Sequence, residues 1–275
     1  MTKLQVLIAT YGEDGLHRVS IHRLPETEGV GYLISCQSPD GRPTVPPGLR
    51  RPDVRVVFSR SKGLSVNRNI LLREASAPYC LLADDDLDFI PEGLKETIGI
   101  LDSSPDIDVI AMQYSDREGK TEKRYPPHPF NLRHPPKGYF ISCVELAFRR
   151  ERVMDRRIMF NENFGVNCRY PCGEDDIWLH DALHARLNGE YRPVKIAIHD
   201  GDSTGIRDMG NPSVLRAQGL VISRMNPLSG LPRTILKAWR TSRICGSGFM
   251  RCLLPALSGW KDCLTQGKEI FKPQQ

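Results

Sequence analysis

The chain has 275 residues, of which 40% are hydrophobic and 26% charged, a composition typical of a globular protein with a buried core. It contains no apolar run of about 18 residues, so no membrane-spanning helix is expected. The first residues include too short an apolar stretch for a secretory signal peptide and no small-residue cleavage site. We therefore expect a cytoplasmic location.

Charge is unevenly distributed along the chain, whose net charge is +5. Residues 215–275 contain ten Lys and Arg against two acids, which gives +8, so the rest of the chain carries −3. A strongly basic C-terminal region and a mildly acidic body call for separate explanations.

The eight cysteines form no recognisable disulfide or zinc pattern. Cys36, Cys80 and Cys143 lie in or beside apolar runs, where a reduced cysteine behaves as a small hydrophobic residue. Cys168 and Cys172 are too far apart for a redox pair, and no second pair with adjacent histidines completes a zinc site. Free thiols are expected, as in most cytosolic proteins.

Extended and helical patterns alternate through the first half of the chain. Apolar, β-prone runs predict strands at residues 4–9, 29–35, 54–58, 79–83 and 108–112. A helix is predicted over residues 65–74 with Ser65 as its N-cap, and Pro91 fits the first turn of another helix. Because these strands are apolar on both faces, we expect an α/β fold with a mostly parallel sheet flanked by helices.

The pattern changes at residues 115–138, which are polar and rich in proline. So long a loop in a compact domain is often a binding lid, and residues 125–139 would close over the ligand in that interpretation. Beyond the loop we expect a strand over residues 139–148, a helix over residues 174–188 and a final strand over residues 194–198.

Three consecutive carboxylates, Asp84, Asp85 and Asp86, follow the apolar run at residues 79–83. They repel one another unless a cation offsets their charge. At the end of a parallel strand they would project into the crevice where α/β sheets hold ligands. Hard oxygen ligands suit Mg²⁺ or Mn²⁺, which are held by one or two carboxylates and substrate phosphates. The alternative is a solvated acidic turn before the helix at Pro91.

Two further clusters lie at predicted helix starts. Lys62 and Arg68 flank a point where free backbone N–H groups and the helix dipole favour an anion such as a nucleotide phosphate. Both could equally be solvated cations. Glu174, Asp175 and Asp176 occupy the first turn of a later helix, where one carboxylate could be a general base. The simpler interpretation is that these acids complement the helix dipole.

His199 follows the last predicted strand and begins a polar, glycine-containing loop. A single histidine after a strand is usually structural. This one could reach a metal ion held by Asp86.

In their order and spacing, the four clusters resemble the GT-A fold family 2 glycosyltransferases over residues 4–205. Residues 6–12 are similar to the opening strand and first nucleotide-contacting turn of that family. Residues 63–69 are similar to its glycine-to-Arg-Asn helix, and residues 79–86 to its strand ending in Asp-any-Asp. Residues 173–175 are similar to its late Glu-Asp pair. The sequence departs from the family at Gln37, because the second strand lacks the usual Asp pair that contacts the base; Gln37 or Asp40 would substitute.

The resemblance implies a role for each matched residue. Asp86 and His199 would hold a divalent cation, Mn²⁺ or Mg²⁺, and Asp84 would face the ribose. Donor-binding residues would be Thr10, Tyr11, Gln37, Lys62, Arg68, Asp84, Asp85 and Ser203. Asp175, with Glu174 beside it, would be the catalytic base. Phe164 and Trp178 would offer apolar faces to the acceptor, with a core role as the equal alternative.

The implied reaction is an inverting transfer of a sugar from a nucleotide sugar, preferably a UDP-sugar, to a hydroxyl of a glycan or lipid-linked acceptor. One alternative is a catalytically silent carbohydrate or membrane adaptor with the same fold. A nucleotidyltransferase is another, although residues 10–14 lack the glycine-rich basic signature that such an enzyme needs. The resemblance also implies a GT-A domain over residues 1–212, with a nucleotide-binding half at about 1–114 and an acceptor half at about 139–212.

Residues 213–275 are expected to form a basic amphipathic helical tail. Between residues 231 and 271, Lys and Arg alternate with Trp, Leu, Ile and Phe, as in helices that lie on an anionic membrane surface. The alternative is a helical subdomain that packs on the body. No nucleic-acid partner is expected, since no known binding motif accompanies the charge.

Overall fold

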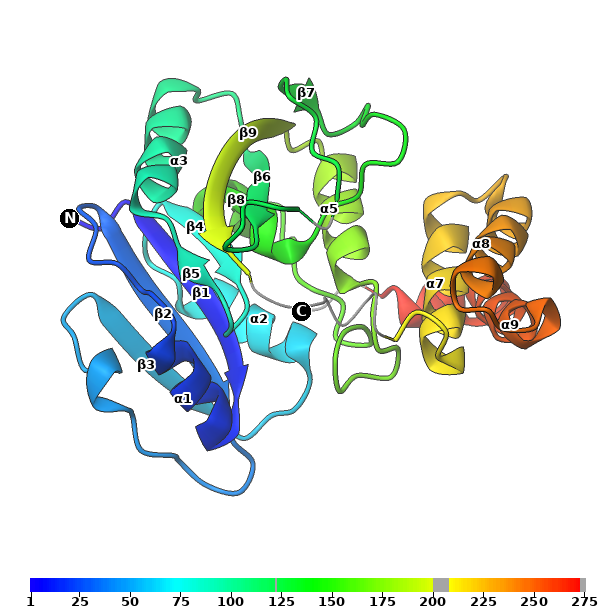
Figure 1. Ribbon diagram of the computed structural model, residues 1–275, viewed down its shortest axis with the longest axis horizontal. Coiled ribbons are helices and arrows are strands. Elements are labelled where there is room, and N and C mark those ends of the chain that lie inside the picture. Colours follow the sequence, from blue (N-terminus) through cyan, green and yellow to red (C-terminus); the bar gives the residue numbers. More distant parts are fainter. Residues whose placement is uncertain (122, 200–207, 273–275) are drawn as a thin grey trace. The chain divides into compact units, whose positions relative to one another are not determined.

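The computed structural model describes residues 1–121, 123–199 and 208–272 (Figure 1). The chain divides into two compact units. The first comprises Met1–Lys62, Val66–Ile158 and Asp181–Gly201, and the second Gly63–Ser65, Met159–His180 and Asp202–Gln275. The boundary expected between residues 212 and 213 lies inside the second unit.

A nine-stranded sheet forms the centre of the first unit, in the order β3-β2-β1-β4-β8-β6-β9-β5, with β7 paired to β9. The strands are β1 Leu4–Tyr11, β2 Val30–Gln37, β3 Val54–Ser59, β4 Tyr79–Ala83, β5 Asp88–Phe89, β6 Val109–Ser115, β7 Phe130–Asn131, β8 Leu146–Arg149 and β9 Gly189–Ile198. Strands β3, β2, β1 and β4 are parallel, as are β6 and β9, whereas the short strands β5, β7 and β8 pair antiparallel. The sheet is therefore mixed, and its longer strands pair in parallel, which confirms the predicted α/β class.

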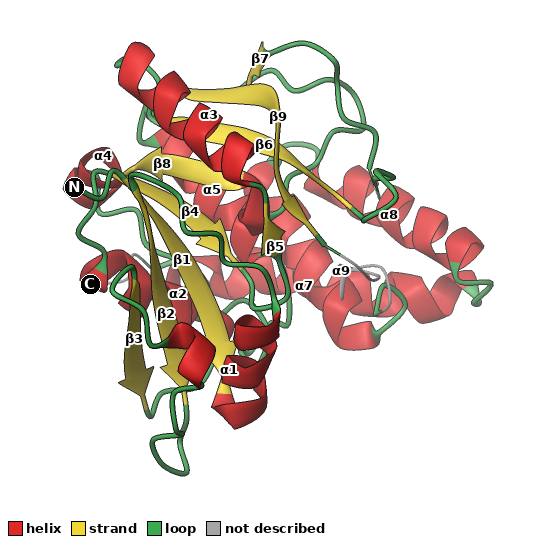
Figure 2. Ribbon diagram, turned by 60° about the vertical axis from the view of Figure 1, so that its left-hand side comes forward, coloured by secondary structure: helices red, strands yellow, loops and turns green. Residues whose placement is uncertain are grey.

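Helices cover both faces of this sheet. Every residue of β2 and β4 is buried, as two-sided covering requires. Helices α1 (Gly12–Ile21) and α3 (Pro91–Ser103) pack on one face, where Leu16 and Leu94 join Val6 and Ile8 in the main core. Figure 2 shows α2 (Leu64–Glu74) on the opposite side of the strands from α1 and α3.

The expected strand over residues 139–148 is mostly wrong, because only β8 at its end is extended. The turn Cys143–Glu145 precedes β8 as a 3₁₀-helix. Ser142 and Glu145 form a reciprocal capping box there, and this local bonding competes with a continuous strand. Helix α1 and the short helix α4 (Arg150–Asp155) were not predicted.

The proline-rich segment after β6 is attached to the sheet by aromatic rings. Tyr191 of β9 stacks on Phe130 at 4.7 Å between ring centroids and on Tyr125 at 6.5 Å. Its hydroxyl also donates to the carbonyl of Pro126 at 2.8 Å. The segment expected as a lid is thus anchored on β9 in this structure, and its closing motion stays a prediction.

The second unit contains the helices α7 (Pro212–Met225), α8 (Gly230–Ile244) and α9 (Phe249–Ile270), so the predicted C-terminal helical extension is present. The start of α5 (Glu174–His184) belongs to the same unit. No helix in the described residues is long and apolar enough to cross a membrane. All eight cysteines lie in described residues, and none of them forms a disulfide.

Helices α7 and α9 cross in close contact at two glycines. A Cβ on Gly219 would lie 2.0 Å from the backbone oxygen of Ala256, and a Cβ on Gly259 would lie 1.8 Å from that of Arg216. Both contacts are with backbone, which has no flexible end to move aside. Any side chain at these positions would therefore push the helices apart.

We expect Gly259→Ala to lower the free energy of unfolding by about 1–3 kcal/mol, as overpacking does in a closely packed interface. Gly267→Ala is the matched control on α9, because its Cβ would meet only the sulfur of Cys263 at 3.9 Å. That change should be neutral or stabilising, since alanine favours a helix more than glycine does. Urea denaturation of both variants gives the comparison, and equal stability of the two would contradict the close crossing.

Candidate active site

The carboxyl ends of several strands meet at one edge of the sheet in the first unit. Strands β1, β2 and β4 run in the same direction, and β9 follows it because β8 is antiparallel to both β4 and β6. The residues at or just beyond these ends are Thr10, Tyr11, Gln37, Asp84, Asp85, Asp86 and His199. The topology therefore brings together residues far apart in sequence, at the edge where such sheets bind ligands.

The three consecutive aspartates have three different partners. Arg68 of α2, whose side chain is only 3% exposed, donates to Asp84 Oδ1 at 2.9 Å. Arg18 of α1 binds both oxygens of Asp85 with its planar fork, at 2.9 and 3.0 Å. Asp84 and Asp85 are thus each stabilised by an arginine from a different helix, which offsets the repulsion between neighbouring charges.

Asp85 has a second internal partner. The hydroxyl of Thr10 at the end of β1 donates to Asp85 Oδ2 at 2.5 Å. Gly15 of α1 makes room for this contact, because a Cβ there would lie 2.1 Å from Thr10 Oγ1. The side chains of Thr10 and Asp85 therefore hold β1, α1 and the acidic run together, and both are engaged within the protein.

Asp86 faces His199, with 3.3 Å between Oδ2 and Nε2. Burial alone raises the pKa of the Asp86 carboxyl, but the hydrogen bond and charge of His199 and the nearby His22 outweigh it, so this pKa lies below its ordinary value. Tyr114 packs edge-on against the His199 ring with 5.8 Å between centroids. The carboxylate form of Asp86 is therefore favoured beside a histidine with a fixed ring.

Asp86 and His199 have the chemistry that a divalent cation needs. Asp86 Oδ1 is shielded from solvent and has no hydrogen-bond partner within the described residues. A buried carboxylate oxygen without a partner is costly, and a cation would satisfy it. No group of three or more His, Cys, Asp or Glu that could hold a metal is found in the part of the chain described. The pair therefore fits an ion that takes its remaining ligands from substrate phosphates and water.

Two residues that sequence analysis did not assign complete this edge. The side-chain nitrogen of Asn67 donates to the carbonyls of Thr10 and Ser35, each at 3.0 Å, which joins the ends of β1 and β2. Arg18 is the other, through its fork on Asp85. Asn67 lies within residues 63–69, which resemble the family's glycine-to-Arg-Asn helix, so the sequence could have indicated its role. Arg18 lies in α1, a helix that the sequence pattern did not predict.

The other expected donor residues differ in accessibility. Tyr11 and Lys62 are exposed, whereas Gln37 is buried and donates to the hydroxyl of Ser61 at 2.9 Å. Gln37 is therefore engaged by a neighbouring loop in this structure. Ser203 lies outside the described residues.

The expected base and acceptor residues belong to the second unit. Glu174 is buried and Asp175 half-buried in the first turn of α5, where the helix dipole stabilises a carboxylate. Phe164 and Trp178 are both fully buried; Phe164 stacks on Tyr170 and Trp178 on Phe160. Both aromatic side chains therefore lie in the core, which was the alternative to an acceptor-binding role, and neither presents a face to a ligand.

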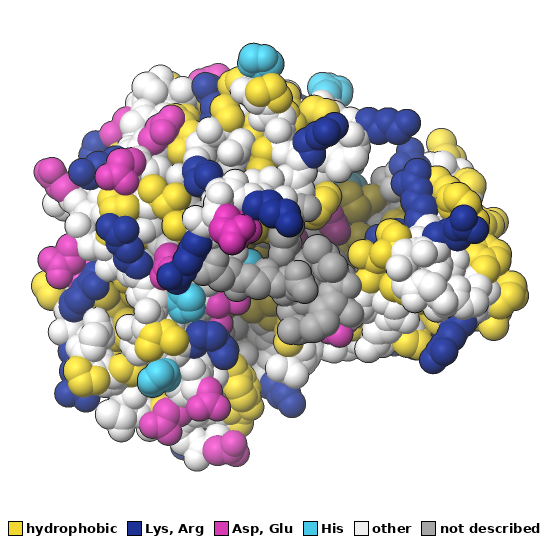
Figure 3. Space-filling view, viewed as in Figure 1, with side chains coloured by type: hydrophobic (Ala, Val, Ile, Leu, Met, Phe, Trp, Pro, Cys, Tyr) yellow, Lys and Arg dark blue, Asp and Glu magenta, His cyan; other side chains and the backbone are white. Residues whose placement is uncertain are grey.

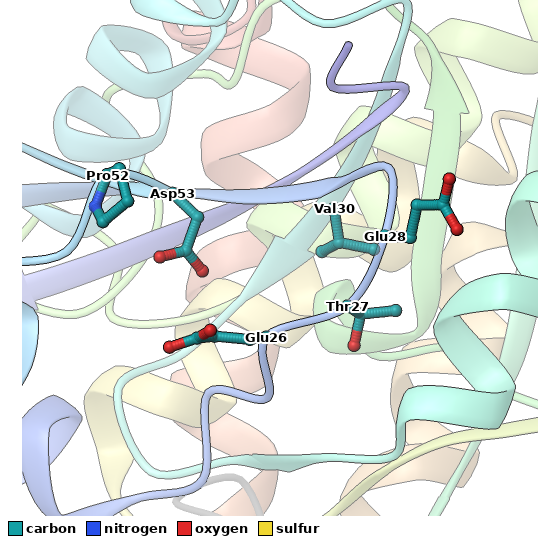
Figure 4. A pocket seen from close by; sticks show the side chains of 6 residues that line it. All are labelled: Glu26, Thr27, Glu28, Val30, Pro52 and Asp53. Atoms are coloured by element: carbon teal, nitrogen blue, oxygen red, sulfur yellow. The ribbon is translucent and has the colours of Figure 1, made fainter.

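A shallow pocket lies at the other end of the first unit's strands (Figure 4). Its lining residues are Glu26, Thr27, Glu28, Val30, Pro52 and Asp53. Val30 begins β2 and Asp53 precedes β3, so the pocket lies at the amino ends of strands whose carboxyl ends carry the acidic edge. It is therefore separate from the candidate site.

A buried ion pair supports the histidine side of the site. Lys123 Nζ lies 2.5 Å from Glu145 Oε2, and the two side chains are 3% and 0% exposed. The Tyr125 hydroxyl donates to the other oxygen of Glu145, and the ammonium lies 5.5 Å from the centre of the Tyr114 ring. Because Tyr114 packs on His199, the buried pair supports His199 through one aromatic ring.

The matching family model is described as glycosyl transferase family 2, and it covers residues 38–173. This range contains Asn67, Arg68 and all three aspartates of the acidic run, and ends immediately before Glu174. The chain belongs to glycosyl transferase family 2. No curated protein matches the sequence.

Solved structures with the same fold include S. aureus TarS, with 18% identity and a TM-score of 0.55 over 81% of this chain. This chain covers 40% of that TarS chain. TarS 1-349 matches at 14% identity and a TM-score of 0.57, over 97% of this chain and 92% of that one. Its complex with UDP-GlcNAc has 14% identity and a TM-score of 0.53, with the same coverage. These similarities confirm the GT-A fold of this glycosyltransferase.

We expect Glu145→Gln to lower the free energy of unfolding by about 3–5 kcal/mol, because it leaves the Lys123 ammonium buried without its counter-charge. The matched control is Glu74→Gln, which breaks an exposed ion pair with Arg55. An exposed pair contributes about 0–1 kcal/mol. Thermal unfolding of both variants is the measurement, and a small effect of Glu145→Gln would show that the buried pair does not stabilise this region.

Proposed function

We propose that this family 2 glycosyltransferase transfers a sugar from a nucleotide sugar to a hydroxyl group of a glycan or lipid-linked acceptor, with inversion at the anomeric carbon. A UDP-sugar is the preferred donor, a choice supported by the TarS complexes with UDP and UDP-GlcNAc. A cytoplasmic location is part of the proposal and is supported by eight cysteines without a disulfide. The observation that carries the proposal is the unequal engagement of the three aspartates.

Asp84 and Asp85 are neutralised by arginines, whereas Asp86 keeps a buried oxygen available beside a histidine. Asp86 and His199 would hold Mn²⁺ or Mg²⁺. When bound, such an ion offsets the charge that develops on the leaving diphosphate. Asp84, which is partly exposed, would accept a hydrogen bond from the ribose, and the exposed Lys62 would add positive charge near the phosphates.

On the acceptor side, Asp175 would remove the proton of the attacking hydroxyl as its oxygen bonds to the anomeric carbon. Glu174 would act beside it. Asp175 is half-buried in the first turn of α5, at the N-terminal end of that helix.

A panel of UDP- and GDP-sugars, assayed for nucleotide release with Mn²⁺ and with a chelator, tests the reaction. We expect turnover with at least one donor and its loss on chelation. Asp86→Asn should lower kcat/KM by about a hundredfold or more, as loss of a transition-state electrostatic contact does. Asp106→Asn, an exposed aspartate outside the site, should leave activity unchanged. No turnover on any donor would favour a silent adaptor, and turnover of a nucleoside triphosphate would favour a nucleotidyltransferase.

The base assignment is tested by Asp175→Asn, which should keep donor binding and abolish transfer. Asp176→Asn is the matched control, since Asp176 is the exposed neighbour in the same helical turn. Donor binding is measured by calorimetry and transfer by product formation. Retained transfer in Asp175→Asn would remove that residue from its proposed role.

A further inference from the structure

Helix α8 presents its apolar residues outward. Its buried residues are small or polar: Gly230, Thr234, Ala238, Thr241 and Ser242. Its large apolar residues are exposed, at 37% to 71%: Leu231, Ile235, Leu236, Trp239 and Ile244. A helix on the surface of a globular protein normally turns its apolar stripe to the core. The reversed arrangement therefore requires an apolar partner outside the unit.

The exposed apolar residues form a stripe rather than isolated points. Leu231, Ile235 and Trp239 are four residues apart along α8, so they lie on one side of the helix. Leu228, two residues before the helix, is fully exposed. On α9, Met250 and Leu254 are also four residues apart and more than half exposed. Contiguous exposed apolar area of this kind marks an interaction surface.

Basic side chains border this stripe. Helix α8 contains four Lys and Arg and no acid, and three of them, Arg233, Arg240 and Arg243, are exposed. Arg251 and Lys261 are exposed on α9. The only acids from residue 212 to residue 272 are Asp262, which is buried and bonded to Arg216, and Glu269. Figure 3 shows hydrophobic and basic side chains side by side on the visible face of these helices.

We propose that the α8 surface, defined as Leu231, Ile235, Leu236 and Trp239 with Arg233, Arg240 and Arg243, binds the anionic surface of a lipid bilayer. Apolar residues with tryptophan would enter the boundary between headgroups and acyl chains, while the arginines contact lipid phosphates. A second copy of the chain fits less well, because the same bases would face one another across a symmetric interface without acids to balance them.

This surface would hold the protein at a membrane without a spanning helix, consistent with the absence of any such helix from the described residues. It does not depend on the transfer reaction, so the two proposals can fail separately. If both hold, the enzyme meets an acceptor that is itself bound to lipid.

Flotation of the full chain with phosphatidylcholine vesicles, and with mixed phosphatidylcholine–phosphatidylglycerol vesicles, tests the proposal. We expect binding to the mixed vesicles only, and weaker binding at high salt. Arg240→Glu/Arg243→Glu should weaken binding about thirtyfold or more, since each basic residue near an anionic surface contributes a factor of about five. Ile235→Ser/Trp239→Ser should weaken it about tenfold or more through lost apolar burial.

Matched controls change the first unit instead. Lys95→Glu/Lys120→Glu reverses two exposed bases there, and Ile21→Ser removes an apolar side chain that is 67% exposed. Both should bind vesicles as the unchanged protein does, and circular dichroism checks that every variant is folded. Equal flotation of the α8 variants and the controls would overturn the proposal. So would vesicle-independent dimerisation that the α8 changes abolish, which would assign the surface to a second copy.

Discussion

Three adjacent carboxylates at the end of a buried strand set the main electrostatic constraint on this protein. The charges of Asp84, Asp85 and Asp86 repel one another, and positive charge near each of them offsets that repulsion. The fold supplies it from three separate elements: Arg68 of α2, Arg18 of α1 and His199 after β9. The third partner differs from the others, because a histidine is a weaker counter-charge and leaves one Asp86 oxygen unsatisfied. That difference separates two aspartates paired with arginines from one that keeps a buried oxygen available to a cation.

The parallel sheet makes this division possible. Strand β8 is antiparallel to both β4 and β6, so β9 ends at the same edge as β4 although more than 100 residues separate Asp86 from His199. Around that edge, Asn67 joins two strand ends and the buried Lys123–Glu145 pair supports Tyr114 under His199. These polar contacts thus hold the strand ends and His199 in place, and few of the described side chains at this edge remain available to a ligand. The candidate base Asp175 belongs to the other compact unit.

Local patterns predicted the buried strands well, because a short, wholly apolar and β-prone run fits a strand covered on both faces. The run at residues 79–83 is an example, since β4 has the same bounds. They failed where side chains far apart in sequence decide the outcome. Glu145 forms a turn because Lys123 and Ser142 bind its carboxylate, and neither contact is visible as periodicity. Likewise, the fork of Arg18 on Asp85 and the burial of Phe164 and Trp178 depend on tertiary packing.

The central claim is that Asp86 and His199 together hold a divalent cation beside a donor diphosphate. Anomalous diffraction from crystals grown with Mn²⁺ and UDP tests it most directly. We expect a manganese peak next to the Asp86 carboxylate and His199 Nε2, the residues that would hold the ion beside the UDP phosphates. UDP bound without a manganese peak at this pair, or manganese held elsewhere such as by Glu26, Glu28 and Asp53, would contradict the account.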